Sequence, residues 1–180
     1  MKGAQSGNEL SVSKADLADV DESYEIIRQC RDQLSQQGMD NWSRYTREKV
    51  EQIIKSGDMY LLKNGKELVG TVKVSAGAPS FYSNEDLEKW EDPEAEAFYF
   101  TALAVSPMHQ GMGYGSVLLD YVEDHARKHE VPYLRMTMFA RNLPLARYYI
   151  RKGFTFPQTR KVAALGLELS FGEKRLKPIT

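Results

Sequence analysis

The sequence has few of the features that would tie a protein to an oxidising compartment, a membrane or a nucleic acid. It contains a single cysteine, Cys30, which can form no disulfide within the chain and which we do not expect to be a catalytic thiol. Its 24 Lys and Arg residues are balanced by 25 Asp and Glu residues, so no basic field points to nucleic acid. No apolar run approaches the roughly 18 residues of a membrane span, and the N-terminus lacks a signal-peptide core. We therefore expect a cytoplasmic protein with neither a nucleic-acid nor a membrane partner.

The length and composition are typical of one globular domain. The chain has 180 residues, of which 42% are hydrophobic and 27% are charged, enough for one core with little room for a second. No internal repeat or low-complexity linker divides it. We expect a single domain over residues 1–180, with a core of about residues 10–172.

Hydrophobic patterning predicts an α/β chain with the element order βααβββαβαββ. Seven segments have the apolar pattern of strands: 10–14, 59–63, 67–75, 95–105, 133–139, 154–162 and 165–171. Four segments have apolar residues at helical spacing: 20–37, 46–56, 113–130 and 143–152. The strand, helix and strand in the middle of the chain predict a parallel, right-handed crossover within a mixed sheet.

Two of the connections between the predicted strands have informative sequences. Asn64-Gly65 predicts a hairpin between the second and third strands, with a type I′ turn that needs positive φ at both residues. Residues 76–94 show no clean period and predict an irregular excursion before the fourth strand.

The glycine-rich segment 110–116 is the strongest indication of function. It reads Gln-Gly-Met-Gly-Tyr-Gly-Ser and joins a buried strand directly to an amphipathic helix. Glycines allow backbone N–H groups to converge, and the helix start adds unpaired N–H groups, so the segment suits a phosphate or pyrophosphate. A Walker A loop is excluded because no lysine lies between Lys89 and Lys128, and a dinucleotide fingerprint fits poorly because Ser116 and Arg135 replace its third glycine and its acid. The alternative is an ordinary glycine-rich turn.

The pattern Gln110-x-x-Gly113-x-Gly115 resembles the Gln/Arg-x-x-Gly-x-Gly/Ala signature of the GNAT superfamily of acetyl-CoA-dependent N-acetyltransferases. The resemblance extends over roughly residues 10–172 and agrees with the predicted order of elements. Other segments match the family's spacing: Leu103-Ala-Val105 with Pro107, Asn142, Tyr149, Gly153-Phe154, Val69-Gly70 and Gly38 to Trp42.

The resemblance implies a fold and a cofactor site. The fold would be an α/β (α+β) arrangement in which four helices flank a mixed sheet of about seven strands, with the fourth and fifth strands splayed. Acetyl-CoA would enter the splay, where its pantetheine arm pairs with backbone groups as an added strand would. The cofactor-binding residues carried over are Leu103, Ala104, Val105, Gln110, Gly111, Met112, Gly113, Tyr114, Gly115, Ser116 and, near the thiol end, Asn142.

The resemblance also implies catalytic roles. Tyr149 stands where the family often has its general acid, which protonates the leaving thiolate; the alternative is a packed aromatic side chain beside Tyr148. Some members have a glutamate base on the strand after the long helix, but here that position is Thr137, which cannot act as a base. Glu96 is the candidate base, acting through a water; the alternatives are an exposed carboxylate and an acceptor amine that arrives neutral.

The acceptor is expected to be a primary amine of a small molecule, an amino acid derivative or a peptide. Trp42 and Tyr45 lie where the family builds its acceptor pocket, with core packing as the alternative. Seven acidic residues within 85–96 could attract a cationic amine, unless they are only solvated.

No metal is expected, because His125 and His129 lack a third ligand. Homodimers are common in the superfamily. An acyl-CoA-binding sensor with little turnover, or a nucleotide-binding module, would be the alternative functions.

Overall fold

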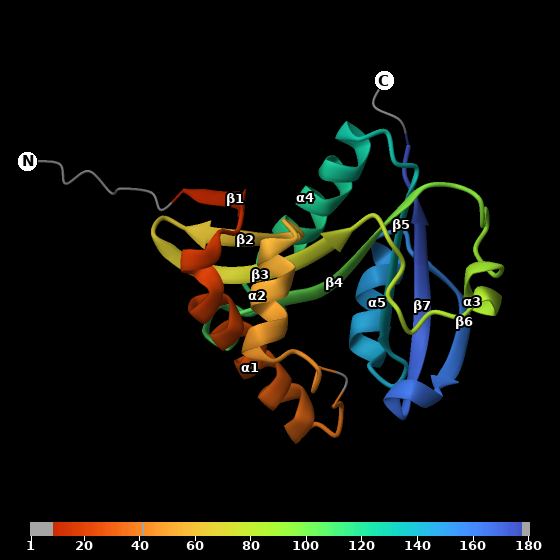
Figure 1. Cartoon of the computed structure of the whole chain (residues 1–180), viewed down its shortest axis with the longest axis horizontal. Helices are drawn as coiled ribbons and strands as arrows, with labels where there is room; N and C mark the ends of the chain where they lie inside the picture. The colour runs from red at the N-terminus through yellow and green to blue at the C-terminus, as the bar shows by residue number, and fades with distance from the viewer. Residues whose placement is uncertain (1–8, 41, 178–180) are drawn as a thin grey trace, which may run out of the picture.

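The computed structural model describes residues 9–40 and 42–177, so Asn41 of the Gly38 to Trp42 segment lies outside the described residues. Seven strands of this part of the chain form one mixed sheet in the order β1-β2-β3-β4-β5-β7-β6 (Figure 1). The strands are β1 (Leu10–Lys14), β2 (Met59–Asn64), β3 (Glu67–Ser75), β4 (Ala97–Val105), β5 (Tyr133–Phe139), β6 (Thr155–Val162) and β7 (Leu167–Arg175). The predicted strands are all confirmed, with shifts of a few residues at their ends.

The parallel crossover expected in the middle of the chain is present. β4 and β5 pair in parallel and are joined by α4 (Tyr114–Lys128), whereas all the other neighbouring strands are antiparallel. None of the described helices is long and apolar enough to cross a membrane.

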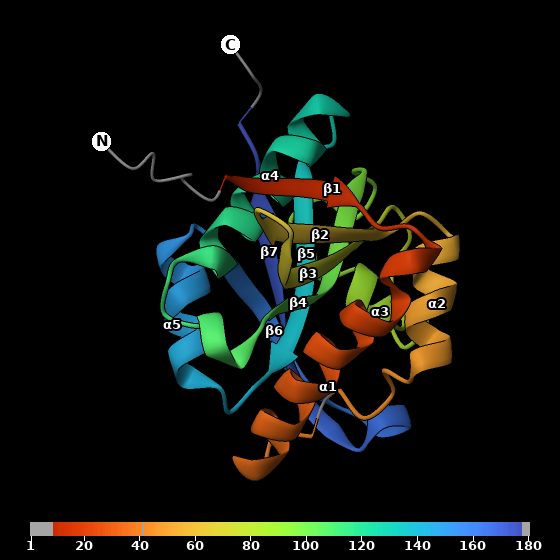
Figure 2. The same ribbon diagram turned by 90° about the vertical axis from the view of Figure 1, so that its left-hand side faces the viewer.

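The longer helices cover the two faces of the sheet. α1 (Val20–Gln36) and α2 (Arg47–Lys55) lie on one face, and α4 and α5 (Leu143–Arg151) lie on the other (Figure 2). β2 shows how the sequence produces this layering, because its side chains alternate between the faces. Met59 and Leu61 pack with α1 and α2, while Tyr60 and Leu62 pack with α4.

The excursion before β4 contains a fifth helix that periodicity did not predict. α3 (Asn84–Leu87) is four residues long, too short for a periodic signal, and a capping box between Ser83 and Asp86 stabilises its start. Asp86 is buried and accepts hydrogen bonds from Arg160 and Gln158 on β6. The excursion is therefore fixed to the far edge of the sheet.

The hairpin between β2 and β3 is confirmed, but the predicted turn type is wrong. Asn64 is the last residue of β2 and pairs with Glu67, so the turn residues are Gly65 and Lys66. Of Asn64, Gly65 and Lys66, only Gly65 has positive φ, at 63°. A register shift between Leu62 and Lys63 moves the turn along by one residue, which leaves Asn64 in extended backbone.

β4 carries a bulge in the part of the strand that does not pair with β5. Its register against β3 shifts between Thr71 and Lys73, so that Ala102 and Leu103 together oppose one residue of β3. Ala102 has φ 50°, which is uncommon for a residue with a side chain, and the buried hydroxyl of Thr71 donates to its carbonyl at 3.1 Å. The bulge changes which residues face α4: Phe98 and Phe100 do so before it, and Leu103 and Val105 do so after it.

The expected splay of the fourth and fifth strands is confirmed. β4 and β5 pair only from Ala97 to Tyr99 and from Tyr133 to Arg135, and then separate although both strands continue. In the separated part of β4, the side chains of Leu103 and Val105 pack toward α4, and those of Ala102 and Ala104 pack toward α1.

Candidate active site

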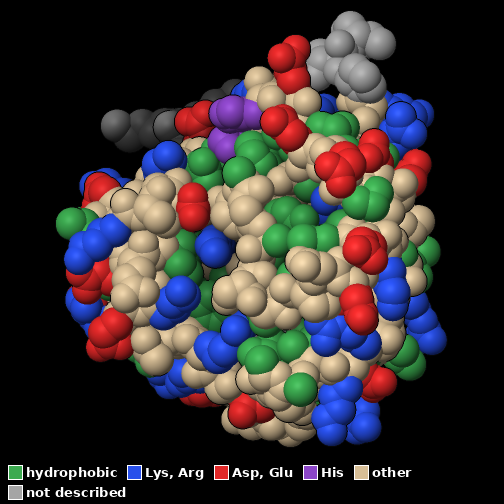
Figure 3. Space-filling view, turned by 45° about the vertical axis from the view of Figure 1, so that its right-hand side comes forward, with side chains coloured by type: hydrophobic (Ala, Val, Ile, Leu, Met, Phe, Trp, Pro, Cys, Tyr) green, Lys and Arg blue, Asp and Glu red, His purple; other side chains and the backbone are tan. Residues whose placement is uncertain are grey.

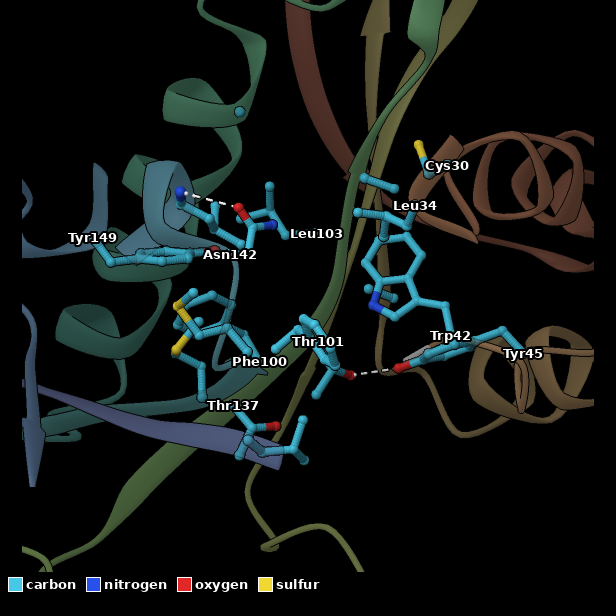
Figure 4. Close-up of a pocket in the computed structure, with 18 of the residues that line it drawn as sticks. Cys30, Leu34, Trp42, Tyr45, Phe100, Thr101, Leu103, Thr137, Asn142 and Tyr149 are labelled. Carbon is cyan, nitrogen blue, oxygen red and sulfur yellow. Dashed lines mark hydrogen bonds between the residues drawn. The ribbon is translucent and has the colours of Figure 1, made fainter. Parts of the chain in front are cut away.

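A cleft with a volume of about 560 Å³ occupies the space between the separated strands. It reaches both sides of β4: Figure 4 shows Leu103, Asn142 and Tyr149 on one side, and Leu34, Trp42 and Tyr45 on the other. In the space-filling view, hydrophobic side chains gather in the middle of the face shown, and charged side chains of both signs surround them (Figure 3). The cleft thus brings together segments that lie more than a hundred residues apart in the sequence.

The loop before α4 presents backbone N–H groups to open space. Gly111 and Gly113 have φ 81° and 82°, and a Cβ at either position would meet no atom within 4 Å. The N–H groups of residues 111–115 donate to no described residue, and Gly113 caps α4 without a side-chain hydrogen bond. Unpaired donors at a helix start, with nothing filling the space beside them, fit an anionic pyrophosphate.

The side chains of this loop are bonded to other segments or exposed. Tyr114 accepts a hydrogen bond from Asn64 at 3.2 Å and stacks on His109, and Met112 is exposed. The Gln110 amide exchanges hydrogen bonds with Gln33 on α1. The loop would therefore hold an anion through its backbone, and its side chains serve to fix its shape.

The exposed edge of β4 forms the next part of the cleft. The carbonyl of Val105 accepts hydrogen bonds from Gln110 Nε2 and from Cys30 Sγ, both at 3.2 Å. Burial raises the pKa of the Cys30 thiol to about 11, so the thiol stays protonated at neutral pH and is a poor nucleophile. Cys30 is thus a packing residue of the cleft wall.

Asn142 and Tyr149, near the two ends of α5, both line the cleft. Asn142 caps the helix, with its Oδ1 accepting from the N–H of Leu145 at 3.3 Å, and its amide group lies beside Leu103 (Figure 4). The Tyr149 ring is buried against Phe100 and Phe154. Burial raises the pKa of the Tyr149 phenol above its usual value, which keeps the hydroxyl protonated.

Tyr148, which the sequence reasoning did not assign to the site, also lines the cleft. Its hydroxyl lies 3.0 Å from the Ser116 hydroxyl in the first turn of α4. The adjacent tyrosines of α5 therefore differ: Tyr148 contacts the start of α4, whereas Tyr149 lies against β4.

On the other side of β4, the connection between α1 and α2 supplies the cleft wall. The Trp42 and Tyr45 rings pack edge to face with centroids 5.9 Å apart, and the Tyr45 hydroxyl donates to Thr101 at 3.0 Å. Arg44, which stands between them in the sequence, places its guanidinium 5.1 Å from the centre of the Phe81 ring.

Several other residues of this side were missed by the sequence reasoning. Arg44 could have been found from its place between Trp42 and Tyr45, but nothing local marks Phe81 or the residues before and within β7. The missed residues that line this side are Leu34, Arg44, Phe81, Leu165, Leu167 and Leu169.

The structure does not bring Glu96 or its acidic neighbours to the cleft. Glu96 is exposed just before β4, at the end where β4 and β5 are still paired. Asp86 pairs with Arg160, and Glu91 pairs with Arg175. Among the described residues that line the cleft there is no carboxylate and no imidazole, while Thr137 does line it. The described ranges also contain no group of three or more metal-ligating side chains.

A loop of unpaired N–H groups that fits a pyrophosphate, beside a split sheet and a cleft that reaches both sides of β4, fits an acyl-CoA-dependent acyltransferase. The model of the Acetyltransferase (GNAT) family matches residues 22–154, and the chain belongs to this family. GNAT acetyltransferases transfer an acetyl group from acetyl-CoA to an amine acceptor, so this protein is an acetyltransferase.

Solved structures show the same fold at low sequence identity. A GNAT-family acetyltransferase of Listeria monocytogenes is 22% identical, with a TM-score of 0.75, and the match covers 95% of this chain and 97% of that one. The ribosomal-protein-S18-alanine N-acetyltransferase of Escherichia coli is 13% identical, with a TM-score of 0.68 and coverages of 96% and 97%. A Salmonella typhimurium structure that contains acetyl-CoA is 17% identical, with a TM-score of 0.70 and coverages of 96% and 96%. No curated protein matches the chain significantly.

Proposed function

We propose that the protein transfers the acetyl group of acetyl-CoA directly to a primary amine of a small molecule, an amino acid derivative or a peptide. The observation that carries this proposal is the single cleft that runs from the loop before α4, past Asn142 and Tyr149, to Trp42 and Tyr45 on the other side of β4. A donor and an acceptor bound on the two sides of the strand would meet in that cleft without a covalent enzyme intermediate.

The cofactor contacts would be made mainly by backbone. The free amides of residues 111–115 would bind the pyrophosphate, whereas the N–H of Ser116 already donates to Gly113. The edge of β4 at Leu103 to Val105, which does not pair with β5, would bind the pantetheine arm as an added strand. The side-chain N–H₂ of Asn142, whose oxygen is already used in capping α5, would contact the arm near its thiol end. When bound, acetyl-CoA supplies an activated thioester carbonyl.

Proton transfer in the cleft would depend on Tyr149. Its hydroxyl makes no hydrogen bond to a described residue and stays protonated because burial raises its pKa, so it can donate a proton to the departing thiolate. Backbone N–H groups at the β4 bulge would stabilise negative charge on the carbonyl oxygen, and one such donor is typically worth about 3–4 kcal/mol. Because no carboxylate or imidazole of the described residues lines the cleft, the attacking amine would enter in its neutral form.

The test is an acceptor screen that detects both products. Purified protein with acetyl-CoA is offered amines, amino acids, polyamines, aminoglycosides and peptides. The peptides include alanine N-termini, because the Escherichia coli neighbour acts on an alanine of ribosomal protein S18. Release of free thiol together with acetylated acceptor, seen by mass spectrometry, is the expected result. Acetyl-CoA binding without turnover on any amine would instead favour an acyl-CoA-binding sensor.

A further inference from the structure

The acceptor side of the cleft has an unusual charge balance. Arg44 is the only charged side chain among the described residues that line the cleft; the rest are aromatic, aliphatic or uncharged polar. The acidic residues that precede β4 are directed elsewhere, since Asp86 is bound by Arg160 and Glu91 by Arg175. The cleft therefore offers one positive charge and no negative charge to an acceptor.

The surroundings of Arg44 leave its guanidinium able to bind a ligand. One face of the guanidinium lies over the Phe81 ring, 5.1 Å from its centre, which orients the group without using its N–H donors. The side chain makes no ion pair and no hydrogen bond with a described residue, in contrast to Arg135, which is buried and paired with Glu173 at 2.9 Å. Trp42 and Tyr45, which flank Arg44 in the sequence, lie on the side of β4 opposite Asn142 and Tyr149 (Figure 4), and Arg44 lines the same cleft.

We propose that Arg44 binds a carboxylate of the acceptor, and that the preferred acceptors are primary amines that carry one carboxylate and an apolar side chain. This proposal rests on the proposed function. Arginine presents a planar fork of donors that matches a carboxylate. A single guanidinium balances a monoanion, whereas a phosphate dianion would leave an uncompensated charge, since no second cation is found among the described residues that line the cleft. Phe81, Leu165 and Leu167 would cover the apolar side chain.

This assignment reverses the sequence-based hypothesis that the acidic stretch attracts cationic amines. A polyamine would bring additional positive charge to a wall whose charged side chain is already cationic. Hydrophobic amino acids and short peptides with a free C-terminus have the required combination of one amine, one carboxylate and an apolar body.

The experiment compares matched acceptors that differ only in the carboxylate. The pairs are L-leucine with L-leucinamide, L-phenylalanine with L-phenylalaninamide, and Gly-Phe with Gly-Phe-amide, at saturating acetyl-CoA. Because an amide also changes the basicity of the amine, the quantity compared is the wild-type to variant ratio of kcat/KM for each acceptor. Arg44→Gln is expected to lower kcat/KM for the carboxylates by roughly 10- to 100-fold, the range of a charge-assisted hydrogen bond, and for the amides by less than about twofold. Arg44→Lys should restore part of the loss.

Arg47→Gln is the matched control. Arg47 is three residues further along, does not line the cleft, and pairs with Asp21 at 2.7 Å, so its replacement should change neither member of a pair. A binding measurement that needs no turnover accompanies the kinetics. Calorimetry in the presence of CoA should show that hydrocinnamate binds to the wild type. Hydrocinnamamide should bind to the wild type more weakly, and hydrocinnamate should bind more weakly to Arg44→Gln.

The outcomes separate the two proposals. Equal losses for carboxylates and amides, or acetylation of other amines but of none of these carboxylates, would overturn the role of Arg44 and leave acetyl transfer intact. Equal binding of hydrocinnamate to wild type and Arg44→Gln would overturn it as well, even without turnover. Failure to acetylate any amine, with acetyl-CoA bound normally, would remove the proposed function and this acceptor assignment with it.

Discussion

The two sides of the cleft are built in different ways. On the side proposed for the cofactor, the binding groups would be mainly backbone groups of one continuous stretch, residues 103–116, where the chain passes from the β4 bulge through the glycine loop into α4. On the side proposed for the acceptor, they would be side chains from three separate segments: the α1–α2 connection, the excursion before β4, and the approach to β7. The first side would bind a part of the ligand that every CoA ester has, and the second is formed by side chains particular to this chain.

This contrast shows why the cofactor could be inferred before the acceptor. A pyrophosphate needs N–H groups, which every residue except proline supplies, so the sequence only has to permit the right backbone shape. An acceptor is selected by side chains, and their identity gives no information until the fold brings them together. Substitutions on the two sides should therefore affect different kinetic constants.

The largest effect is expected at the glycine loop. Gly113→Asp should weaken acetyl-CoA binding by at least roughly 100-fold, because Gly113 has φ 82° and a carboxylate there would repel the pyrophosphate. Calorimetry and the thermal shift induced by acetyl-CoA measure this directly. Gly113→Ala separates backbone strain from charge, and Gly77→Asp is the control, since Gly77 lies in the excursion with open space around it and no positive φ. Affinity within about twofold of wild type for Gly113→Asp would contradict the loop assignment.

A smaller effect is expected at Tyr149, where the two sides meet. Tyr149→Phe keeps the ring packed against Phe100 and Phe154 and removes the proton donor. Since a thiol leaves easily, kcat should fall by about 10- to 100-fold, the low end for general acid catalysis, with acetyl-CoA affinity hardly changed. Wild-type activity should show no falling limb below about pH 10, because burial raises the pKa of Tyr149 above its ordinary value.

Two other tyrosines, Tyr148 and Tyr121, serve as comparisons for Tyr149→Phe in single-turnover measurements. Tyr148→Phe removes the contact with Ser116 and should weaken acetyl-CoA binding a few-fold without a matching loss of kcat. Tyr121→Phe, on α4 outside the cleft, should change neither constant. Equal rates for wild type and Tyr149→Phe, with chemistry rate-limiting, would reduce Tyr149 to a packing residue.

On the acceptor side, Trp42→Ala should raise the KM of the acceptor by about tenfold, because it removes the edge-to-face contact with Tyr45 and part of the cleft wall. The Kd of acetyl-CoA should stay within about twofold of wild type, since the cofactor contacts lie across β4. Steady-state kinetics with the acceptor found in the screen gives both values. A larger change in acetyl-CoA affinity than in acceptor KM would contradict the assignment of Trp42 to the acceptor side.

The smallest effect is expected for Glu96→Gln. The side chain is exposed and does not line the cleft, so kcat/KM and its pH profile should stay within about twofold of wild type. The rise of kcat/KM with pH should follow the ionisation of the acceptor amine and shift when an acceptor of different basicity is used. A limb that disappears in Glu96→Gln would show that this carboxylate acts as a base through water.

Local sequence patterns predicted most of the secondary structure. The spacing of apolar residues predicted each strand and the four longer helices, because burial of one face imposes a period of 2 or 3.6 residues. This spacing did not predict α3, which is fixed by the polar contacts of Ser83 and Asp86. The turn between β2 and β3 was also predicted wrongly, because a register shift displaces it. The sequence left open whether Glu96 is a base or an exposed carboxylate, because its position relative to the splay depends on how far β4 and β5 pair.

The sequence by itself determined the glycine loop at the start of α4, since glycine is the residue that takes positive φ there without strain. It also placed Asn142 and Tyr149 on one short helix, where their spacing is a local property. Only the tertiary structure decided that an alanine, Ala102, would take positive φ and open β4 away from β5. The same is true of Arg44 and Phe81, which stand far apart in the chain and meet because the α1–α2 connection and the excursion before β4 reach the same side of the cleft. Such contacts follow from register and packing across the whole sheet, and no short segment encodes them.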